Sequence, residues 1–330
     1  MSWNLLREAF LAVGMIGVLV LSLWGITGQM PPLVVVESDS MVHNAESGEV
    51  GSIDAGDLIL VHQYQTTKVI TFAEASQPFN RYYDYSSHGM NGDVIIYEKN
   101  GKVGTPIIHR AILEAVPSLT QAVNDSTECN TSVYDSSLEA CILSWDVPGT
   151  TLRNVSSISW VFDGNMTGEY DCQRNSQFNH GEVGMTQFLT IENWKPQRAG
   201  FMTLGDNNKC SVDQGWSPSK GGVVGATGLF DSDGMGVDAV SRNHLVGIAG
   251  GEIPWLGTVK LMMSGNGSPG TSQVPGASWG WLFVSIASVL ALPIILEPLL
   301  NRIIKGSPEI AEAEQERNYA GRLPDNASSA

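Results

Sequence analysis

Two long apolar runs, one near each end of the chain, constrain this protein more than any other feature of its sequence. The first covers residues 9–26 and the second covers residues 277–296, and neither contains a charged residue. Each run is close to the roughly 20 residues that an α-helix needs to cross the hydrocarbon core of a bilayer. The sequence therefore predicts two membrane anchors with the main domain between them.

The first run could instead be the apolar part of a cleaved signal peptide, because Arg7 gives it a basic start. It is longer than the roughly 7–15 residues of such a region, and the residues that follow it make a poor small-x-small cleavage site. We therefore expect residues 9–28 to be kept as an anchor.

Basic residues lie outside both apolar runs: Arg7 precedes the first, and Arg302 and Lys305 follow the second. By the positive-inside rule, residues 1–8 and 301–330 should lie in the cytoplasm, and the segment between the anchors should be exported. We therefore expect a multi-pass protein of the cell membrane, with its main domain on the extracellular side.

Glycosylation signals are crowded in the segment predicted to be exported. It contains five Asn-x-Ser/Thr acceptor tripeptides, which begin at Asn124, Asn130, Asn154, Asn165 and Asn266. A sixth, at Asn326, falls in the predicted cytoplasmic tail and should stay unmodified. A glycoprotein is the expected product.

All four cysteines, Cys129, Cys141, Cys172 and Cys210, also lie between the anchors. An even number of cysteines in an oxidising compartment predicts disulfides. Three connectivities are open, and we favour the one with the short Cys129–Cys141 loop. The chain has no Cys-x-x-Cys pair and no cluster of histidines, so no metal or other cofactor is expected.

The charge of the chain excludes one class of partner. The formal net charge is -16 and the sequence pI is about 4.6. No basic stripe is present to neutralise phosphates, so we expect no nucleic-acid partner.

Short β-branched runs follow turn signals in the main domain. Gly-Asp turns at residues 56–57 and 92–93 are followed by such runs at residues 58–61 and 94–97, which predicts strands. An Asn-Gly hairpin turn follows the second run, and its returning strand carries His109. We therefore predict a mostly β domain, with helix only in the two anchors.

Four residues are candidates for chemistry. A serine becomes a nucleophile when a neighbouring base takes its proton, and that base works best when a third group orients it. The candidates in chain order are Ser40, in a turn after a β-branched run, His109, and either Asp206 or Asp213. Taken singly, each fits an ordinary structural role in a turn, strand or loop.

The flanks of these residues together resemble signal peptidase I, in the serine–histidine form found in archaea and in the endoplasmic reticulum. Ser38-Asp39-Ser40-Met41 is similar to the Ser-Gly-Ser-Met motif of the family, with Asp39 in place of the usual Gly. Ile107-Ile108-His109-Arg110 resembles its histidine motif, and Gly205-Asp206-Asn207-Asn208 followed by Asp213 resembles its acid motif. Residues 247–257 resemble a later stretch of the family.

The resemblance, over about residues 33–113 and 200–262, implies a serine endopeptidase that removes signal peptides from exported precursors. Ser40 would be the nucleophile and His109 the base. Asp213 is the first choice for orienting His109, and Asp206 is the second. The Ser40 N–H and, by resemblance, the Ser38 hydroxyl would stabilise the oxyanion. The bacterial form uses a lysine base, whereas the matching strand here offers His109.

The implied fold is mostly β: a signal-peptidase-like β-rich catalytic domain with a β- and loop-rich insert, flanked by two transmembrane helices. The predicted partners are the signal peptides of secreted precursors and membrane lipid, with the protein-export channel as a further candidate. The expected parts are a cytoplasmic N-terminus (1–8), an anchor (9–28), the catalytic domain in two parts (29–116 and 200–276), the exported insert (117–199), a transmembrane helix (277–300) and a cytoplasmic tail (301–330).

Two alternatives to this function are open. The chain could be a catalytically inactive, glycosylated, membrane-anchored surface-binding protein on the same fold, which the large insert and Asp39 favour. It could also be a regulatory protease of related fold that cuts a few specific membrane substrates.

Overall fold

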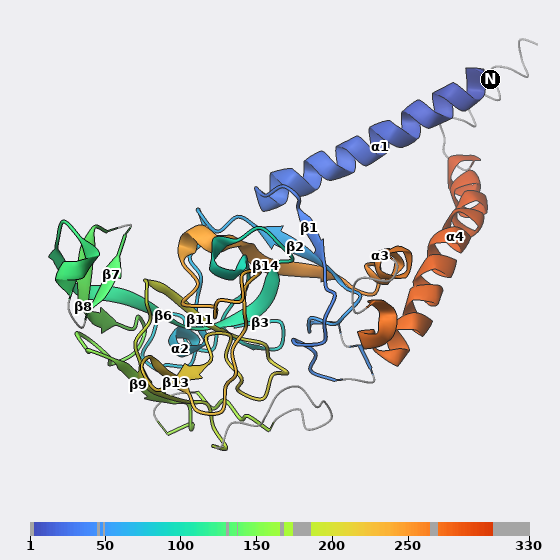
Figure 1. Cartoon of the computed structure of the whole chain (residues 1–330). Helices are drawn as coiled ribbons and strands as arrows, with labels where there is room; N and C mark the ends of the chain where they lie inside the picture. The colour runs from blue at the N-terminus through green and yellow to red at the C-terminus, as the bar shows by residue number, and fades with distance from the viewer. Residues whose placement is uncertain are drawn as a thin grey trace, which may run out of the picture. The chain divides into compact units, whose positions relative to one another are not determined.

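The computed structural model describes residues 3–44, 47–48, 50–129, 132–136, 138–165, 168–173, 186–264 and 270–305 (Figure 1). The chain forms two compact units, Met1–Ser278 and Trp279–Ala330. The first unit contains three β-sheets, so the protein is mostly β, as predicted.

Long helices form at both predicted anchors. Helix α1 covers Trp3–Thr27 and helix α4 covers Gly276–Lys305. Within them, Ala9–Thr27 and Gly276–Pro298 are long and apolar enough to cross a membrane, by length and composition.

The prediction that helix occurs only in the anchors is wrong. Two short helices lie in the β-rich unit, α2 at Phe72–Ala75 and α3 at Thr258–Met263. Helix α2 starts with a capping box, in which the Thr71 side chain accepts from the Glu74 amide and the Glu74 side chain accepts from the Thr71 amide. Such local capping supports single turns of helix that hydrophobic periodicity over a longer window does not reveal.

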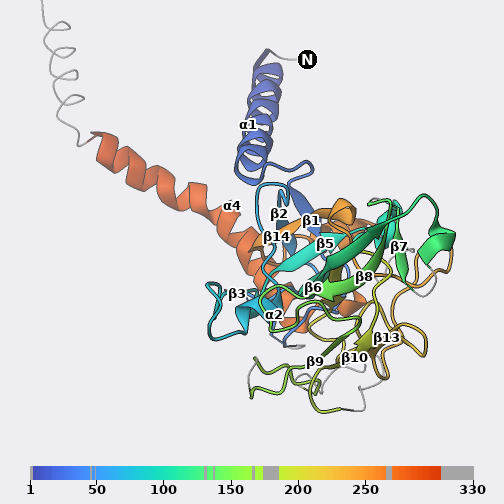
Figure 2. The same ribbon diagram turned by 90° about the vertical axis from the view of Figure 1, so that its left-hand side faces the viewer.

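The largest sheet has eight strands. Seven follow the order β1-β2-β14-β5-β6-β8-β7 (Figure 2), and the eighth, β11, pairs with β6 beside this path. All of its neighbours are antiparallel. The strands are β1 (Leu33–Val35), β2 (Leu58–His62), β5 (Val94–Tyr97), β6 (Ile107–Ala122), β7 (Val133–Asp135), β8 (Ala140–Asp146), β11 (Gly200–Leu204) and β14 (Leu245–Ile253).

Two smaller sheets complete the unit. One has the order β12-β13-β10-β9 and the other pairs β3 with β4. Their strands are β3 (Ser86–Ser87), β4 (Met90–Asn91), β9 (Ile158–Val161), β10 (Thr190–Trp194), β12 (Trp216–Ser217) and β13 (Gly221–Val223). Short 3-10 turns lie at Lys99–Gly101, Ser126–Cys129, Arg242–His244 and Gly270–Gln273.

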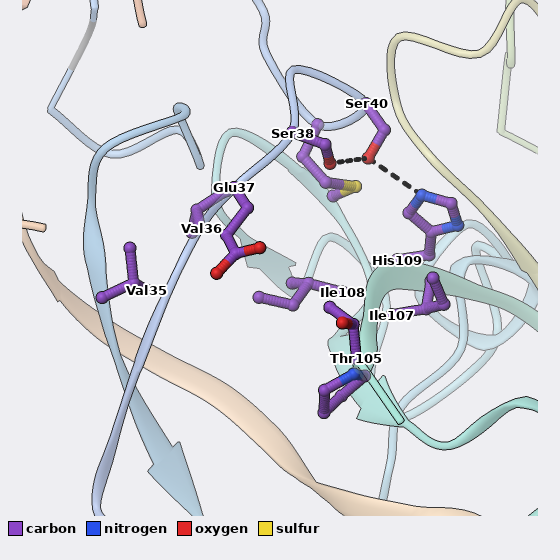
Figure 3. A pocket seen from close by; sticks show the side chains of 11 residues that line it. Val35, Val36, Glu37, Ser38, Ser40, Thr105, Ile107, Ile108 and His109 are labelled. Atoms are coloured by element: carbon purple, nitrogen blue, oxygen red, sulfur yellow. Dashed lines mark hydrogen bonds between the residues drawn. The ribbon is translucent and has the colours of Figure 1, made fainter. Parts of the chain in front are cut away.

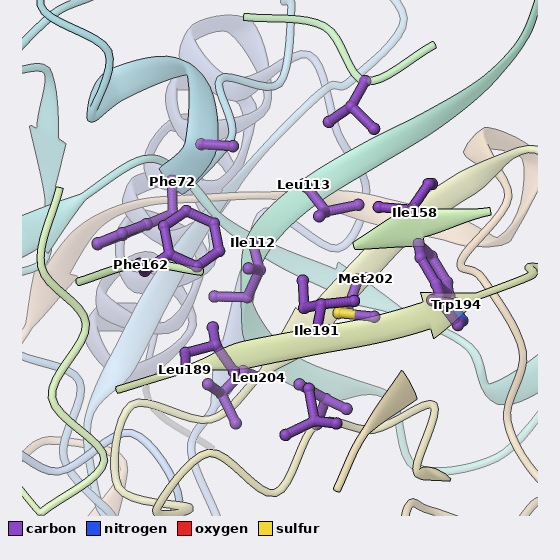
Figure 4. Packing of buried hydrophobic residues seen from close by; sticks show 14 of the residues in the cluster. Phe72, Ile112, Leu113, Ile158, Phe162, Leu189, Ile191, Trp194, Met202 and Leu204 are labelled. Carbon is purple, nitrogen blue, oxygen red and sulfur yellow. The ribbon is translucent and has the colours of Figure 1, made fainter. Parts of the chain in front are cut away.

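The segment predicted as an insert, residues 117–199, is rich in strands and loops, and its described residues share a core with the rest of the unit. Strand β6 runs across its expected start, and β10 pairs with β13 of the following segment. One buried cluster joins the two parts (Figure 4): Ile158, Phe162, Leu189 and Trp194 of the insert pack with Phe72, Ile112, Leu113, Met202 and Leu204. The apolar faces of both parts are therefore buried together.

The four cysteines form two disulfides, Cys129–Cys141 and Cys172–Cys210. The favoured short loop is therefore confirmed. The second bridge links the insert to the stretch that contains Asp206 and Asp213. Of the glycosylation acceptors, Asn124, Asn154 and Asn165 have exposed side chains, and Asn130, Asn266 and Asn326 lie outside the described residues.

Candidate active site

Ser40 lies in a turn that is clamped by the predicted acid motif. After β1, the chain continues to pair with the segment before β2, since the Val36 amide donates to the Asp57 carbonyl at 3.0 Å. The Asn207 amide then donates to the Ser40 carbonyl at 2.8 Å, and the Asn207 side chain donates to the Asp39 carbonyl at 2.9 Å. Two motifs far apart in the sequence therefore hold the position of the serine.

Asp39 stands at the position where the similar family motif has Gly, and an aspartate is compatible with the backbone conformation of this turn. Its backbone does not adopt a positive φ, so the conformation is open to residues other than glycine.

Ser40, His109 and Asp213 form one hydrogen-bonded chain. The Ser40 Oγ lies 2.9 Å from His109 Nε2, and His109 Nδ1 lies 2.7 Å from Asp213 Oδ2 (the serine–histidine bond is drawn in Figure 3). His109 and Asp213 are buried, with 4 % and 1 % of their surface exposed, while Ser40 is half-buried. A serine, an imidazole and a carboxylate in this order can generate a nucleophilic alkoxide without a metal or another cofactor.

The strand register explains why these groups meet. In the antiparallel pairing, His109 of β6 lies opposite Ile95 of β5, so Tyr97 is its diagonal neighbour. On the other side of β6, Thr203 of β11 lies opposite Ala111, two residues beyond His109. Because alternate residues share a face of a sheet, all three side chains project from the same face.

Asp213 collects hydrogen bonds from each of these three strands. Besides His109, the Tyr97 hydroxyl donates to Asp213 Oδ2 at 2.7 Å and the Thr203 hydroxyl donates to it at 2.6 Å. The Asp213 amide also donates to the Thr203 carbonyl at 3.0 Å. These bonds hold the carboxylate against the histidine ring.

Gly205 allows the acid motif to approach the histidine. A Cβ at this position would lie 2.8 Å from His109 Nε2 and 2.7 Å from the Ser40 carbonyl oxygen. Both distances are too short for a carbon atom, so any larger residue would displace the serine or the ring.

Asp206, the second candidate for holding His109, is bound elsewhere. It accepts two hydrogen bonds from the fully buried Arg110, at 2.8 and 2.6 Å, and its Oδ2 lies 2.8 Å from His43 Nε2. Burial by itself would raise the pKa of Asp206, but the Arg110 guanidinium and the His43 ring hold it well below its usual value. Asp206 therefore supports the turn that carries Ser40 through its bonds to Arg110 and His43, and Asp213 is the acid that contacts His109.

A cleft of about 420 Å³ leads to the Ser40–His109 pair (Figure 3). One wall is β1 and its extension, and the other is the start of β6. Its lining is mainly apolar: Val35, Val36, Met41, Pro106, Ile107 and Ile108, with Glu37, Ser38 and Thr105 among them. A second hollow of about 340 Å³ continues along the same two walls, where Glu37 pairs with Lys260 at 3.0 Å.

Two hydrogen-bond donors, the Ser38 hydroxyl and the Ser40 amide, lie close to the Ser40 hydroxyl oxygen. The Ser38 hydroxyl is exposed in the cleft, 3.1 Å from Ser40 Oγ. Among the described residues, none accepts a hydrogen bond from the Ser40 amide. The sequence predicts these two groups as donors to an oxyanion, and their position next to the Ser40 oxygen is compatible with that prediction.

The sequence predicted no role for four residues of this site, Tyr97, Thr203, Arg110 and His43, although Arg110 lies in the histidine motif. Tyr97 could have been identified from the sequence, because it is two residues from Ile95 in β5 and so lies on the same face of the hairpin as His109. For the other three residues the sequence does not indicate the hydrogen-bond partner, since the partners come from distant strands and loops.

Comparison with known proteins identifies no relative of this chain. No protein-family model, no curated protein and no solved structure matches the chain. The residues of the site and their geometry are therefore the basis for the function below.

Proposed function

We propose that this protein is a membrane-bound serine endopeptidase of the signal peptidase I type, which cleaves signal peptides from exported precursor proteins. The observation that carries the proposal is the chain from Ser40 through His109 to Asp213, at the end of an apolar cleft. The resemblance of the serine, histidine and acid motifs supports the same reaction.

In this mechanism the Ser40 oxygen attacks the carbonyl carbon before the scissile bond while His109 Nε2 takes its proton. Asp213 keeps the Nδ1–H of His109 directed towards itself and stabilises the imidazolium. The Ser40 amide and the Ser38 hydroxyl donate to the oxyanion. His109 then gives the proton to the leaving amine, and a water activated by His109 hydrolyses the acyl-enzyme.

The walls of the cleft support binding of an extended peptide. Strand β1 is at the end of its sheet, and residues Ile107–His109 of β6 pair only with β5 among the described strands. Both walls therefore offer backbone groups with which a substrate strand could pair, with its alternate side chains entering the apolar hollows. Small residues one and three places before the cut would suit these shallow hollows.

The sequence position of Ser40 supports a substrate held in the membrane. Ser40 follows the end of helix α1, at Thr27, by only about a dozen residues. A signal peptide has an apolar segment that would lie in the lipid and a cleavage site just outside it. With both chain ends in the cytoplasm, the cleft would lie on the extracellular side, where exported precursors emerge.

The test is cleavage of a model preprotein by the purified full-length protein in detergent or liposomes. The wild type should cleave at the signal-peptide junction, and Ser40→Ala and His109→Ala should abolish turnover. A fluorophosphonate probe, which labels activated serines, should mark wild type and not Ser40→Ala. Normal turnover by His109→Ala would rule out the proposed base.

A groove in the insert favours a second candidate, a surface-binding protein without catalysis. The hollow, of about 670 Å³, lies along the edge strand β9 and is lined by Trp160, Val161, Leu152 and Glu192 among others. Mixed apolar and polar lining of this size suits a ligand. This candidate predicts that Ser40→Ala leaves precursor processing in cells intact.

A further inference from the structure

Tyr97 packs in a buried apolar cluster and also carries a polar group into it. No part of its surface is exposed, yet it carries a hydroxyl, and that hydroxyl donates to Asp213 Oδ2 at 2.7 Å. Burial and the neighbouring carboxylate raise the pKa of Tyr97 well above its usual value, so it remains a neutral donor at every working pH.

All the described hydrogen bonds to the Asp213 carboxylate fall on one oxygen. His109, Tyr97 and Thr203 each donate to Oδ2, whereas Oδ1 is buried and has no hydrogen-bond partner among the described residues. The Tyr97 and Thr203 hydroxyls therefore compete with His109 Nδ1–H for the same negative charge. The number and strength of these hydroxyl hydrogen bonds determine how strongly the Asp213 carboxylate stabilises a protonated His109 ring.

We propose that Tyr97, with Thr203 beside it, is a positioning residue that fixes the Asp213 carboxylate and moderates the basicity of His109. This inference rests on the proposed function, because it concerns how the basicity of His109 is set in the same site. Tyr97 keeps its proton throughout and touches neither the substrate nor the reacting atoms.

The direction of the effect follows from the geometry. Without the Tyr97 hydroxyl, the charge on Asp213 Oδ2 is shared by fewer donors, so the bond from His109 strengthens and the protonated ring is favoured. The pKa of His109 should then rise. A base must be unprotonated to act, so the acid limb of the kcat/KM profile should move to higher pH.

Charged groups near the site also form pairs with one another, and neither variant removes a member of these pairs. These pairs are Glu37 with Lys260 beside the cleft, and Asp206 with Arg110 and His43 behind the serine turn.

The experiment compares wild type, Tyr97→Phe and Thr203→Val in the full-length protein. Tyr97→Phe keeps the ring and removes only the donor, and Thr203→Val removes the second donor with a different change in shape. We expect each to shift the acid limb upward by about 0.5–1 pH unit, to lower kcat about tenfold and to leave KM near the wild-type value. Tyr85→Phe is the matched control, because it removes a tyrosine–aspartate bond of 2.7 Å, to Asp93, that makes no contact with the triad.

A second readout does not depend on turnover. The His109 ring, assigned by comparison with His109→Gln, can be titrated by NMR in protein with isotope-labelled histidines. An upward shift in Tyr97→Phe supports the inference even if no preprotein is cleaved, in which case only the proposed function fails. Active wild type with an unchanged or lowered His109 pKa in both variants would overturn the inference and leave the proposed function standing.

Discussion

Arg110 and Asp206 form a bidentate ion pair, with hydrogen bonds of 2.8 Å and 2.6 Å, one residue along the chain from His109 and from Asn207 respectively. Arg110 also donates to the carbonyls of Ser87 and Gly92, at 2.9 and 2.7 Å. The strand that carries His109 and the turn that holds Ser40 are therefore joined through one buried pair. In the histidine motif, Arg110 forms the buried ion pair and the neighbouring His109 contacts Ser40. In the acid motif, Asp206 completes the ion pair and the neighbouring Asn207 binds the backbone of the serine turn.

The two aspartates should consequently respond differently to substitution. Asp206→Ala leaves the buried Arg110 without its carboxylate and should cost about 3–5 kcal/mol of unfolding free energy. Asp213→Ala removes a partner of one imidazole and two neutral hydroxyls, so it should cost less stability but lower kcat by roughly 10³–10⁴.

Denaturant unfolding and preprotein cleavage, measured on the same samples, separate these effects. Asp206→Asn is the control that keeps the shape of the side chain and removes its charge. A stable, inactive Asp206→Ala together with an active Asp213→Ala would reverse the assignment of the two acids.

Ser38 should contribute to the rate rather than to substrate binding. Its hydroxyl lies 3.1 Å from Ser40 Oγ and would reach the oxyanion only as that charge develops. Ser38→Ala should lower kcat by about 10²–10³ and change KM little, because the lost bond forms in the transition state. Steady-state kinetics with a peptide substrate measure both, and Ser38→Thr, which keeps the hydroxyl, should retain more activity. Equal kcat in wild type and Ser38→Ala would remove Ser38 from the oxyanion site.

Glu252 should make the protein less stable as the pH rises. Its side chain is buried, one oxygen accepts from the Gly51 amide, and the other has no hydrogen-bond partner among the described residues. Burial raises the pKa of Glu252 to about 7, from an ordinary value of 4.5. The folded state therefore holds this proton more tightly than the unfolded chain, so stability falls between about pH 4.5 and pH 7 as the proton is lost.

Glu252→Gln keeps the shape and cannot ionise. Its unfolding free energy should gain on that of wild type as the pH is raised through this window, and the difference should level off above it. Thermal unfolding at several pH values measures the effect, with Glu192→Gln on the exposed surface of β10 as the control. A difference that does not change with pH would show that Glu252 is ionised throughout.

The two disulfides should differ in their effect on activity. Cys172–Cys210 closes a separation of 38 residues and ends three residues before Asp213, whereas Cys129–Cys141 closes 12 residues at the far end of β6 and β8. Replacing either pair by serine should cost stability, about 2–5 kcal/mol and more for the longer loop. Only the Cys172→Ser/Cys210→Ser protein should also lose turnover, because the loop that carries Asp213 becomes less restrained. Equal activity of both double variants at a temperature where they are folded would contradict this role.

Several features were predictable from the sequence because they depend on local patterns. The apolar runs that form α1 and α4 are visible in a window of about 20 residues. The turn signals followed by β-branched runs predicted β2 and β5. The motif resemblance singled out Ser40, His109 and two candidate acids, Asp213 and then Asp206, and the short spacing of Cys129 and Cys141 favoured the pairing that is observed.

Other features were decided only by the tertiary structure. The choice of Asp213 over Asp206 as the partner of His109 depends on the register of β5, β6 and β11, which brings Tyr97 and Thr203 to the same carboxylate. The core shared by residues 117–199 and the rest of the unit depends likewise on contacts between positions far apart in the chain, such as Phe72 with Phe162. A local pattern states which residues are apolar or turn-forming, but a hydrogen-bond partner is selected by the relative placement of distant strands, and that placement exists only in the folded chain.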